Sequence, residues 1–379
     1  MAKQASKLKR LLWFMSMSKE DRIVENFRTV TEVIPYSLVR RAGGVFHFEK
    51  KLETIPKQFL YKGSNVDISQ LLKETWTTGF LVIKDDAIRF EEYYLGNTAD
   101  TLNISWSAGK SFVSALVGIA IEEGAISGVN AIVSDLAPEL RGSGYEGIRL
   151  KDVLQMSSGV GFNEEYRNFF SDINRMGRTV ALGKSLNAFA CSLKTERPPG
   201  TYCHYVSMDT QVLGIVLKVV TGKTPTEYLE EKIWRRIGME HDARWLVDDT
   251  GMELVFGTLN ASLRDYGRFG RLYMNGGNWN GEQIVSKEWV EESVTMDGPH
   301  VQAGKNDCSD YADGYGYQWW IPQEPDGDFF ACGIHGQYIY IHPQQKVVIV
   351  KTSADPNWTA NSEYNPMVVK MLQYLANHI

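Results

Sequence analysis

The order of strand and helix patterns along the chain is the feature that most constrains its fold. Two apolar runs, Gly79–Lys84 and Ala87–Tyr94, flank a pair of aspartates, which predicts two strands joined by a turn. Helical patterns dominate from about residue 107 to residue 300, and a last amphipathic helix is predicted to begin near Pro366. Further strand patterns precede that helix, at Tyr317–Pro322, Phe329–Cys332, Gln337–His342 and Val347–Ser353. Strands at both ends of a helical middle predict an α+β fold in which helices interrupt a sheet domain.

This order divides the chain into three regions. Its length of 379 residues is typical of about two domains. We expect residues 1–45 to form an N-terminal helical extension and residues 101–311 to form a mainly helical domain. Residues 46–100 and 312–379 are expected to come together as one discontinuous sheet domain with α/β character.

The composition excludes several classes of function. The net charge is −6 and no basic tract is present, so nucleic acid is not an expected partner. The four cysteines form no C-x-x-C pair, which argues against a zinc site and against a redox motif. We therefore expect neither a metal nor another cofactor, and structural thiols in a reducing compartment.

The N-terminus begins like a secretory signal, because basic residues precede the apolar run Leu11–Met15. The run is short, however, and it ends in Lys19–Arg22 without a small-residue cleavage site. We expect a helix that packs on the body of a cytoplasmic protein; a peripheral membrane helix is the alternative. No run reaches the roughly 18 apolar residues of a membrane span, so no stable membrane insertion is expected.

The pair Ser107 and Lys110, in SWSAGKSF, opens an apolar helical segment. Residues three apart share one helix face, so the two side chains are neighbours. Phe112–Ile121 is apolar nearly all round, which predicts a buried helix. Burial and the positive end of the helix dipole both lower the pKa of a lysine in its first turn. Such a lysine can accept the serine proton, while the Ser107 N–H is suited to stabilise an oxyanion. The alternative is a lysine that extends to solvent.

Three later stretches place this pair in a family. They are IRLKDVLQMSSG at 148–159, PPGTYCHYVS at 198–207 and ACGIHGQ at 331–337. Together with SWSAGK they resemble the serine hydrolases related to class C β-lactamases and DD-peptidases, especially family VIII carboxylesterases and 6-aminohexanoate-oligomer hydrolases. The resemblance runs from about Thr78 to the C-terminus and does not cover residues 1–50. It implies an antiparallel sheet flanked by helices, an inserted all-helical domain and a site at the interface between the two.

The resemblance also implies roles for individual residues. Ser107 matches the nucleophile, Lys110 its base, and Tyr205 the tyrosine of a Y-x-N motif that relays a proton to the leaving group. Two cationic neighbours are expected to favour the phenolate form of this tyrosine. Ser207 takes the place of the motif's asparagine as a substrate-binding residue, and the backbone N–H of Ile334 completes an oxyanion hole with that of Ser107.

The lysine-threonine-glycine motif of the family is altered. Its best match is Ala331-Cys332-Gly333, so no lysine stands at its first position. Such a site is expected to bind carboxylates weakly, since a hydrogen bond to a charged group contributes roughly 1.5–3 kcal/mol. Gly333 remains a candidate substrate contact, and His335 replaces the cation only if it is protonated and turned inward.

Three further residues are candidate substrate contacts. Tyr166 resembles a loop tyrosine of the aminohexanoate-oligomer hydrolases; the alternative is a solvated loop aromatic. Asp172 is a candidate to attract a substrate amine, and Asn260 is expected to face the cleft.

The resemblance implies a serine hydrolase that cleaves short-chain carboxylic esters or linear amides through an acyl-enzyme, with a small molecule as its substrate. A 6-aminohexanoate-oligomer amidase is one alternative. A β-lactamase, a DD-peptidase or a non-catalytic β-lactam-binding relative is another. The altered lysine motif and the lack of a recognisable signal peptide disfavour a β-lactamase and a DD-peptidase. A sensor needs a membrane span, and an inactive relative usually lacks one of the three catalytic residues. The oligomeric state stays open, with a homodimer among the options.

Overall fold

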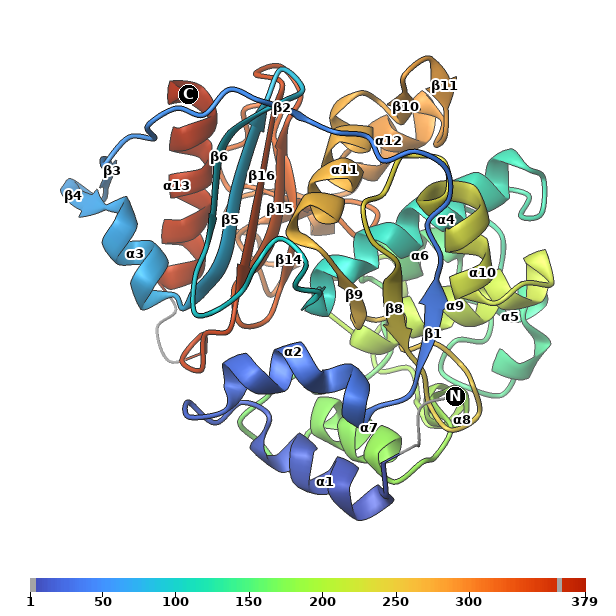
Figure 1. Cartoon of the computed structure of the whole chain (residues 1–379). Coiled ribbons are helices and arrows are strands. Elements are labelled where there is room, and N and C mark those ends of the chain that lie inside the picture. The colour runs from blue at the N-terminus through green and yellow to red at the C-terminus, as the bar shows by residue number, and fades with distance from the viewer. Residues whose placement is uncertain (1–4, 360–362) are drawn as a thin grey trace.

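The computed structural model describes residues 5–359 and 363–379, and an eight-stranded sheet forms its largest element (Figure 1). The strand order is β12-β13-β14-β15-β16-β5-β6-β2, and all neighbours are antiparallel except β2 and β6. The strands are β2 (Glu49–Lys50), β5 (Thr77–Lys84), β6 (Ala87–Tyr93), β12 (Gly314–Tyr315), β13 (Trp320–Ile321), β14 (Phe329–Gly333), β15 (Gln337–His342) and β16 (Val347–Ser353). Strands from both ends of the chain thus meet in one sheet, as the order of the patterns predicts.

Most of the predicted strands are confirmed, and β15 and β16 have the predicted bounds. The strand expected over Tyr317–Pro322 is wrong, because only Trp320 and Ile321 are in extended pairing. Gln318 has a φ of 63°, and its N–H donates to the carbonyl of Leu154. This left-handed residue turns the chain and shortens the strand.

Both faces of the sheet are buried, which explains the continuous apolar runs of its central strands. Phe80, Val82 and Ile349 contribute to the core beneath α13 (Tyr364–His378), which begins two residues before the predicted Pro366. Leu81 and Val350 contribute to the larger core on the other face, where α11 (Leu263–Met274) packs across β15 and β16. Successive side chains of a strand point to opposite faces, so an apolar run serves two layers.

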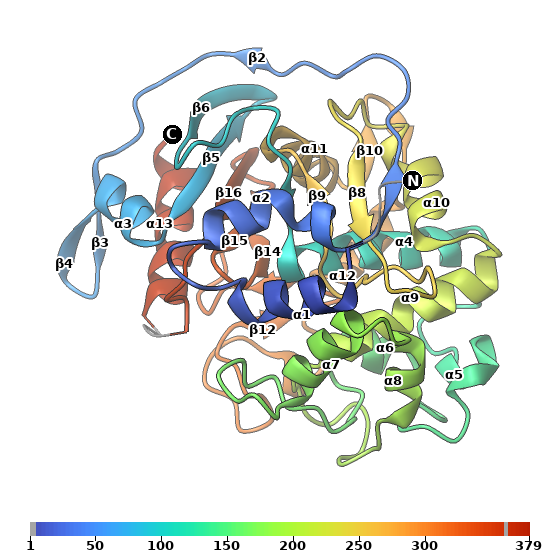
Figure 2. The same cartoon turned by 60° about the horizontal axis from the view of Figure 1, so that its bottom comes forward.

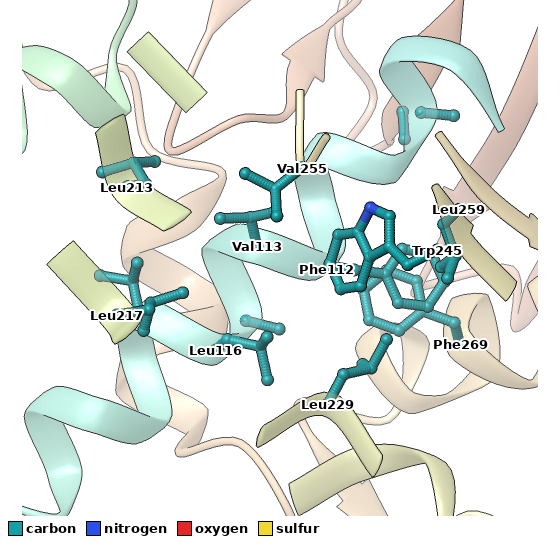
Figure 3. Packing of buried hydrophobic residues seen from close by; sticks show 14 of the residues in the cluster. Phe112, Val113, Leu116, Leu213, Leu217, Leu229, Trp245, Val255, Leu259 and Phe269 are labelled. Carbon is teal, nitrogen blue, oxygen red and sulfur yellow. The ribbon is translucent and has the colours of Figure 1, made fainter. Parts of the chain in front are cut away.

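The helical region is built around α4 (Lys110–Glu122), whose neighbour is α9 (Ser207–Thr221) (Figure 3). Phe112 of α4 stacks on Phe269 of α11 with ring centroids 3.6 Å apart, which joins the helical region to the sheet. A Cβ on Gly118 would lie 2.4 Å from the side chain of Trp289, so only glycine fits where α4 packs against this tryptophan. The remaining helices of the region are α5 (Val133–Leu136), α6 (Leu150–Leu154), α7 (Asp172–Ala181), α8 (Leu186–Ser192), α10 (Pro225–Leu229) and α12 (Lys287–Ser293).

The N-terminal segment is part of the body of the molecule. Helices α1 (Lys7–Ser16) and α2 (Ile23–Val33) pack on each other, and α1 also packs on α7 (Figure 2). The next strand, β1 (Tyr36–Val39), is the edge of a second sheet with β8 (Ala243–Leu246), β9 (Leu259–Ala261) and β7 (Asn103–Ile104). Within residues 5–359 and 363–379, no helix is both long and apolar enough to cross a membrane.

Small elements complete the chain. Helix α3 (Ile68–Glu74) follows the hairpin of β3 (Gln58–Tyr61) and β4 (Ser64–Asp67), and both lie beside α13 (Figure 1). A second hairpin joins β10 (Asn278–Trp279) to β11 (Glu282–Gln283) next to α11. The site described below lies between the main sheet and the helical region.

Candidate active site

Ser107 lies in a tight turn between β7 and α4. The turn is a short 3-10 helix, Trp106–Gly109, and Trp106 has a φ of 42°. Two glycines press against it: a Cβ on Gly257 would lie 2.6 Å from the carbonyl carbon of Trp106, and one on Gly333 would lie 2.9 Å from the Ser107 nitrogen. The backbone of Ser107 is therefore held between two chain segments that are distant in sequence.

Lys110 is the immediate partner of Ser107. Its Nζ lies 3.0 Å from Ser107 Oγ and 3.4 Å from Ser207 Oγ, and it donates to the Phe256 carbonyl. The side chain is only 1% exposed, and burial lowers the pKa of Lys110 to about 7. A neutral amine has two N–H donors and one lone pair, which suits two acceptors and one hydroxyl donor. The alternative of a lysine extending to solvent is wrong.

Tyr205 closes the other side of the nucleophile. Its ring lies 5.0 Å from Lys110 Nζ and stacks on Trp320 with centroids 5.7 Å apart. Burial raises the pKa of Tyr205 well above its usual range, and interaction with the Ser107 hydroxyl lowers it by less. The expected phenolate is therefore corrected to a neutral phenol. The second cation is missing at Ala331, and desolvation is the largest influence on the Tyr205 pKa.

Ile334 follows Gly333 at the end of β14, where that strand reaches the nucleophile turn. Ile334, Gly333 and Ser107 all line one cavity. The close approach of Gly333 to the Ser107 nitrogen brings the two proposed oxyanion donors, the N–H groups of Ser107 and Ile334, to the same end of the cleft.

Glu164 is a functional candidate that sequence reasoning missed. Its Oε1 accepts the Ser207 N–H at 2.6 Å, and the carboxylate also interacts with the Tyr166 hydroxyl. Burial raises the pKa of Glu164, and nearby Lys110 lowers it by less. The available signal was its position two residues before Tyr166, because alternate residues of an extended segment point to the same side.

Three predicted substrate contacts lie close to Ser107. Tyr166, Ser207 and Gly333 each line a cavity that also contains Ser107. The Tyr166 ring packs edge-on against Trp358 at 5.0 Å. Tyr166 is therefore a wall of the cleft, and the alternative of a solvated loop aromatic is wrong.

His335 does not supply the missing cation. Its Nδ1 donates to the Asp355 carbonyl at 2.6 Å, and the ring packs against Phe27, Trp106 and Trp358. Burial lowers the pKa of His335 to about 4, so the ring is neutral near pH 7. The proposed protonated, inward-facing histidine is corrected to a neutral residue of the packed wall behind the site.

Asp172 and Asn260 serve the fold. The Asp172 carboxylate accepts the Asn163 N–H at 3.0 Å and pairs with Arg175 at 2.5 Å, so it begins α7 and does not line the cleft. Asn260 is buried in β9, where its Nδ2 donates to the carbonyls of Thr258 and Arg244. Both expected substrate contacts are corrected, because the Asp172 carboxylate is held by the Asn163 N–H and Arg175, and the Asn260 Nδ2 by backbone carbonyls.

A second buried lysine reaches the cleft, from strand β16. Cys332 pairs with Tyr338, and Tyr338 pairs with Lys351, so the three lie in one row across β14, β15 and β16. Lys351 is wholly buried, its Nζ donates to Ser353 Oγ, and it lines the same cavity as Ser107. Burial lowers the pKa of Lys351 to about 7, and Asp355 raises it by less. The signal was a lysine inside the apolar run VVIVKTS.

Two cavities meet at Ser107, and both also reach Tyr166 and Ile334. The first, here called the apolar cavity, has walls from α1, α2 and α7 and a volume of about 100 Å³. The second, the polar cavity, has a volume of about 400 Å³ and contains Glu164, Tyr205 and Lys351. The cleft is thus two-sided, with the nucleophile at the junction.

Comparison with known proteins agrees with this architecture. The family model described as Beta-lactamase matches residues 68–371. The 6-aminohexanoate-dimer hydrolase of Paenarthrobacter ureafaciens is 30% identical over 299 residues, which cover 77% of this chain and 76% of that protein.

Solved structures show the same fold. A candidate 6-aminohexanoate-dimer hydrolase from Bacillus anthracis superimposes with a TM-score of 0.83 at 24% identity, covering 95% of this chain and 96% of that one. A family VIII carboxylesterase reaches a TM-score of 0.58 at 14% identity, covering 76% and 91% of the two chains. The resemblance drawn from the motifs is confirmed, and the chain belongs to the beta-lactamase family of serine hydrolases.

Proposed function

We propose that this protein hydrolyses short carboxylic esters or linear amides through an acyl-enzyme on Ser107. The observation that carries the proposal is the 3.0 Å approach of a buried Lys110 Nζ to Ser107 Oγ. With a pKa of about 7, Lys110 is neutral often enough near physiological pH to accept the serine proton.

The proposed reaction has two half-reactions. Ser107 Oγ transfers its proton to Lys110 and attacks the substrate carbonyl carbon, while the N–H groups of Ser107 and Ile334 stabilise the oxyanion. The proton then passes from Lys110 through the Tyr205 phenol to the leaving oxygen or nitrogen, whose bond to carbon breaks. A water repeats these steps on the ester of Ser107, releasing the carboxylic acid and restoring both protonation states.

A linear amidase of the 6-aminohexanoate type is the second candidate. It is supported by the 30% identity to the Paenarthrobacter relative and by the position of Tyr166 beside the nucleophile. An amine leaves only when it is protonated, and Tyr166 and Tyr205 both lie where they can assist that step. A β-lactamase is supported by Lys351, whose amine can bind a carboxylate in the polar cavity when it is protonated, and is opposed by Ala331.

The test is covalent labelling of Ser107. A fluorophosphonate probe and p-nitrophenyl butyrate are applied to wild type, Ser107→Ala and Ser16→Ala, with the adduct site read by peptide mass spectrometry. We expect wild type and Ser16→Ala to be labelled and active, and Ser107→Ala to be neither. Ser16 is the matched control because it also precedes a lysine by three residues. Labelling that persists in Ser107→Ala would disprove the proposal.

We also propose a cytoplasmic location. The apolar N-terminal residues Trp13 and Phe14 line the apolar cavity, and the Arg10 guanidinium pairs with Asp249, so these side chains are used inside the fold. Fractionation of cells producing the protein with a C-terminal tag tests this proposal, and recovery in a secreted or membrane fraction contradicts it.

A further inference from the structure

The apolar cavity has no assigned role, although it opens onto the nucleophile. Ser107, Gly257 and Ile334 line one part of it, and Trp13 and Phe14 of α1 line another. Its volume of about 100 Å³ compares with roughly 10–15 Å³ for one water on the same measure. A space of this size beside a reactive serine is more than a packing defect.

The direction of the leaving group indicates which part of the substrate each cavity binds. Tyr205, the proposed proton donor to the leaving group, lines the polar cavity and is absent from the walls of the apolar one. The leaving oxygen or nitrogen therefore faces the polar cavity. In the tetrahedral intermediate the acyl substituent points away from that atom, which directs it to the apolar cavity.

The chemistry of the walls restricts the acyl group. Among the described residues that line the apolar cavity, none carries a charge. Asn174 Nδ2 donates to the carbonyls of Tyr166 and Asn168, and Thr258 Oγ1 donates to the carbonyl of Leu254, so these polar groups are already used. An ammonium group placed there would lose its hydration without a compensating anion.

The indole groups of the cavity wall offer no hydrogen-bond acceptor to an ammonium. The Nε1 atoms of Trp13 and Trp106 are buried without a hydrogen-bond partner in the described part of the chain. An indole N–H is only a donor, so neither group can accept a hydrogen bond from an ammonium. A chain that ends in a methyl group needs no partner at all.

Part of the outer wall comes from α1 and α2, which lie outside the segment matched by the family model, because that segment begins at residue 68. Phe14 of α1 packs so closely on α7 that a Cβ on Gly177 would lie 2.0 Å from its ring. Buried Arg10 holds the same helix through a two-pronged hydrogen bond to Asp249. Helix α1 is thus fixed as a rigid end wall, and a rigid wall sets a length limit.

We propose that the apolar cavity binds the acyl chain of the substrate, that this chain is an uncharged aliphatic group, and that α1, α2 and α7 limit its length. The proposal rests on the acyl-enzyme route proposed above. Each methylene that enters the cavity is expected to raise kcat/KM about fourfold at most, until the wall is reached.

The test compares p-nitrophenyl esters from acetyl to decanoyl with the 6-aminohexanoyl ester, which has the length of the heptanoyl ester but ends in an ammonium. We expect kcat/KM to rise with chain length to a maximum and then to fall. The heptanoyl ester is expected to exceed the 6-aminohexanoyl ester by about tenfold or more, because the ammonium must be desolvated. A flat profile, or preference for the 6-aminohexanoyl ester, overturns the proposal.

Two matched variants at the end of α7 test whether the dependence on chain length arises in the apolar cavity. Val180 is buried and lines the apolar cavity, whereas Leu182, just beyond the helix end, is 39% exposed. Val180→Phe is expected to shift the optimum to shorter chains, whereas Leu182→Phe, which changes a residue outside the cavity lining, is expected to leave the profile as in wild type. An unshifted optimum in a Val180→Phe protein with a native circular dichroism spectrum overturns the proposal.

A binding measurement separates this inference from the reaction itself. Calorimetry with 1-octanol is carried out on Ser107→Ala and on Ser107→Ala combined with Val180→Phe. Binding to the first protein that is lost in the second supports the cavity even when no ester is hydrolysed, a result in which only the proposed function fails. No binding to either protein, together with active ester hydrolysis, rejects the cavity and leaves the proposed function intact.

Discussion

The two cavities that meet at Ser107 are lined by different kinds of residues. The apolar cavity is lined by side chains from α1, α2 and α7 and by loop and strand residues around Ser107, and it holds no charged group among its described lining residues. The polar cavity is lined by strand residues, loop residues and α13, and it contains Glu164, Asp313, Lys351 and Asp355. The difference teaches that one centre adjoins two environments, and we propose that the apolar side selects the substrate by shape and the polar side by charge.

The largest effect is expected from a substitution at the centre that is common to both cavities. Lys110→Ala should lower kcat by at least ~10²-fold for esters and amides alike, because it takes away the proposed base. Combined with Tyr205→Phe, the loss should be smaller than the product of the single losses, since both residues serve one proton path. Steady-state kinetics of the double-mutant cycle measures this, and fully multiplicative losses would separate the two roles.

Tyr205→Phe tests whether the polar cavity supplies the proton that the leaving group needs. An amine must be protonated as it leaves, whereas an activated phenolate departs without a proton. We expect at least ~10²-fold loss on a linear amide and a clearly smaller loss on a p-nitrophenyl ester of the same acyl group. Tyr166→Phe should show the same bias to a lesser degree. Equal losses on both substrates would remove the leaving-group role.

The pH profile depends on the shared centre. The reactive form of Lys110 is neutral, and its pKa is lowered by burial to about 7. Below that pH the amine is protonated and cannot accept the serine proton, so kcat/KM should fall about tenfold per pH unit on the acid side. A profile measured with a neutral ester tests this, and activity that is constant down to pH 5 would exclude Lys110 as the base.

Replacing Lys351 tests whether its charge selects anionic substrates in the polar cavity. Substrates with a carboxylate in the leaving group should lose about tenfold or more in kcat/KM in Lys351→Met, because a charge-assisted hydrogen bond is removed. Neutral esters with the same acyl group are the control and should be unaffected. Nitrocefin belongs to the first class, so any turnover of it should also depend on Lys351. A uniform loss on neutral and anionic substrates would indicate a structural role.

The smallest expected effect is on stability. Burial lowers the pKa of Lys351 to about 7 in the folded protein, so below that pH its charge is buried at a cost that the unfolded chain does not have. The unfolded chain binds more protons above pH 7, so this contribution to stability improves as pH rises toward the ordinary lysine pKa. Lys351→Met should therefore be more stable than wild type at pH 6, with a gap that narrows by pH 10. Chemical denaturation at the two pH values measures it.

Sequence reasoning succeeded where the determinants are local. Ser107 and Lys110 are one helical turn apart, so helix geometry alone brings them together. The bounds of β15 and β16 follow from apolar runs bordered by turn residues. The strand expected at Tyr317–Pro322 failed because Gln318 adopts a left-handed conformation through a contact with distant Leu154.

What the sequence by itself determined is the pairing of Ser107 with Lys110, the family and the mixed architecture, because helix periodicity and short motifs depend on residues close in the chain. The tertiary structure alone decided the surroundings of that pair. Strand register carried Lys351 into the cleft, and packing turned His335 into the wall and left Asn260 bonded to backbone carbonyls. The apolar cavity exists only because α1 and α2 fold back onto α7, since burial and desolvation are properties of segments that meet in space.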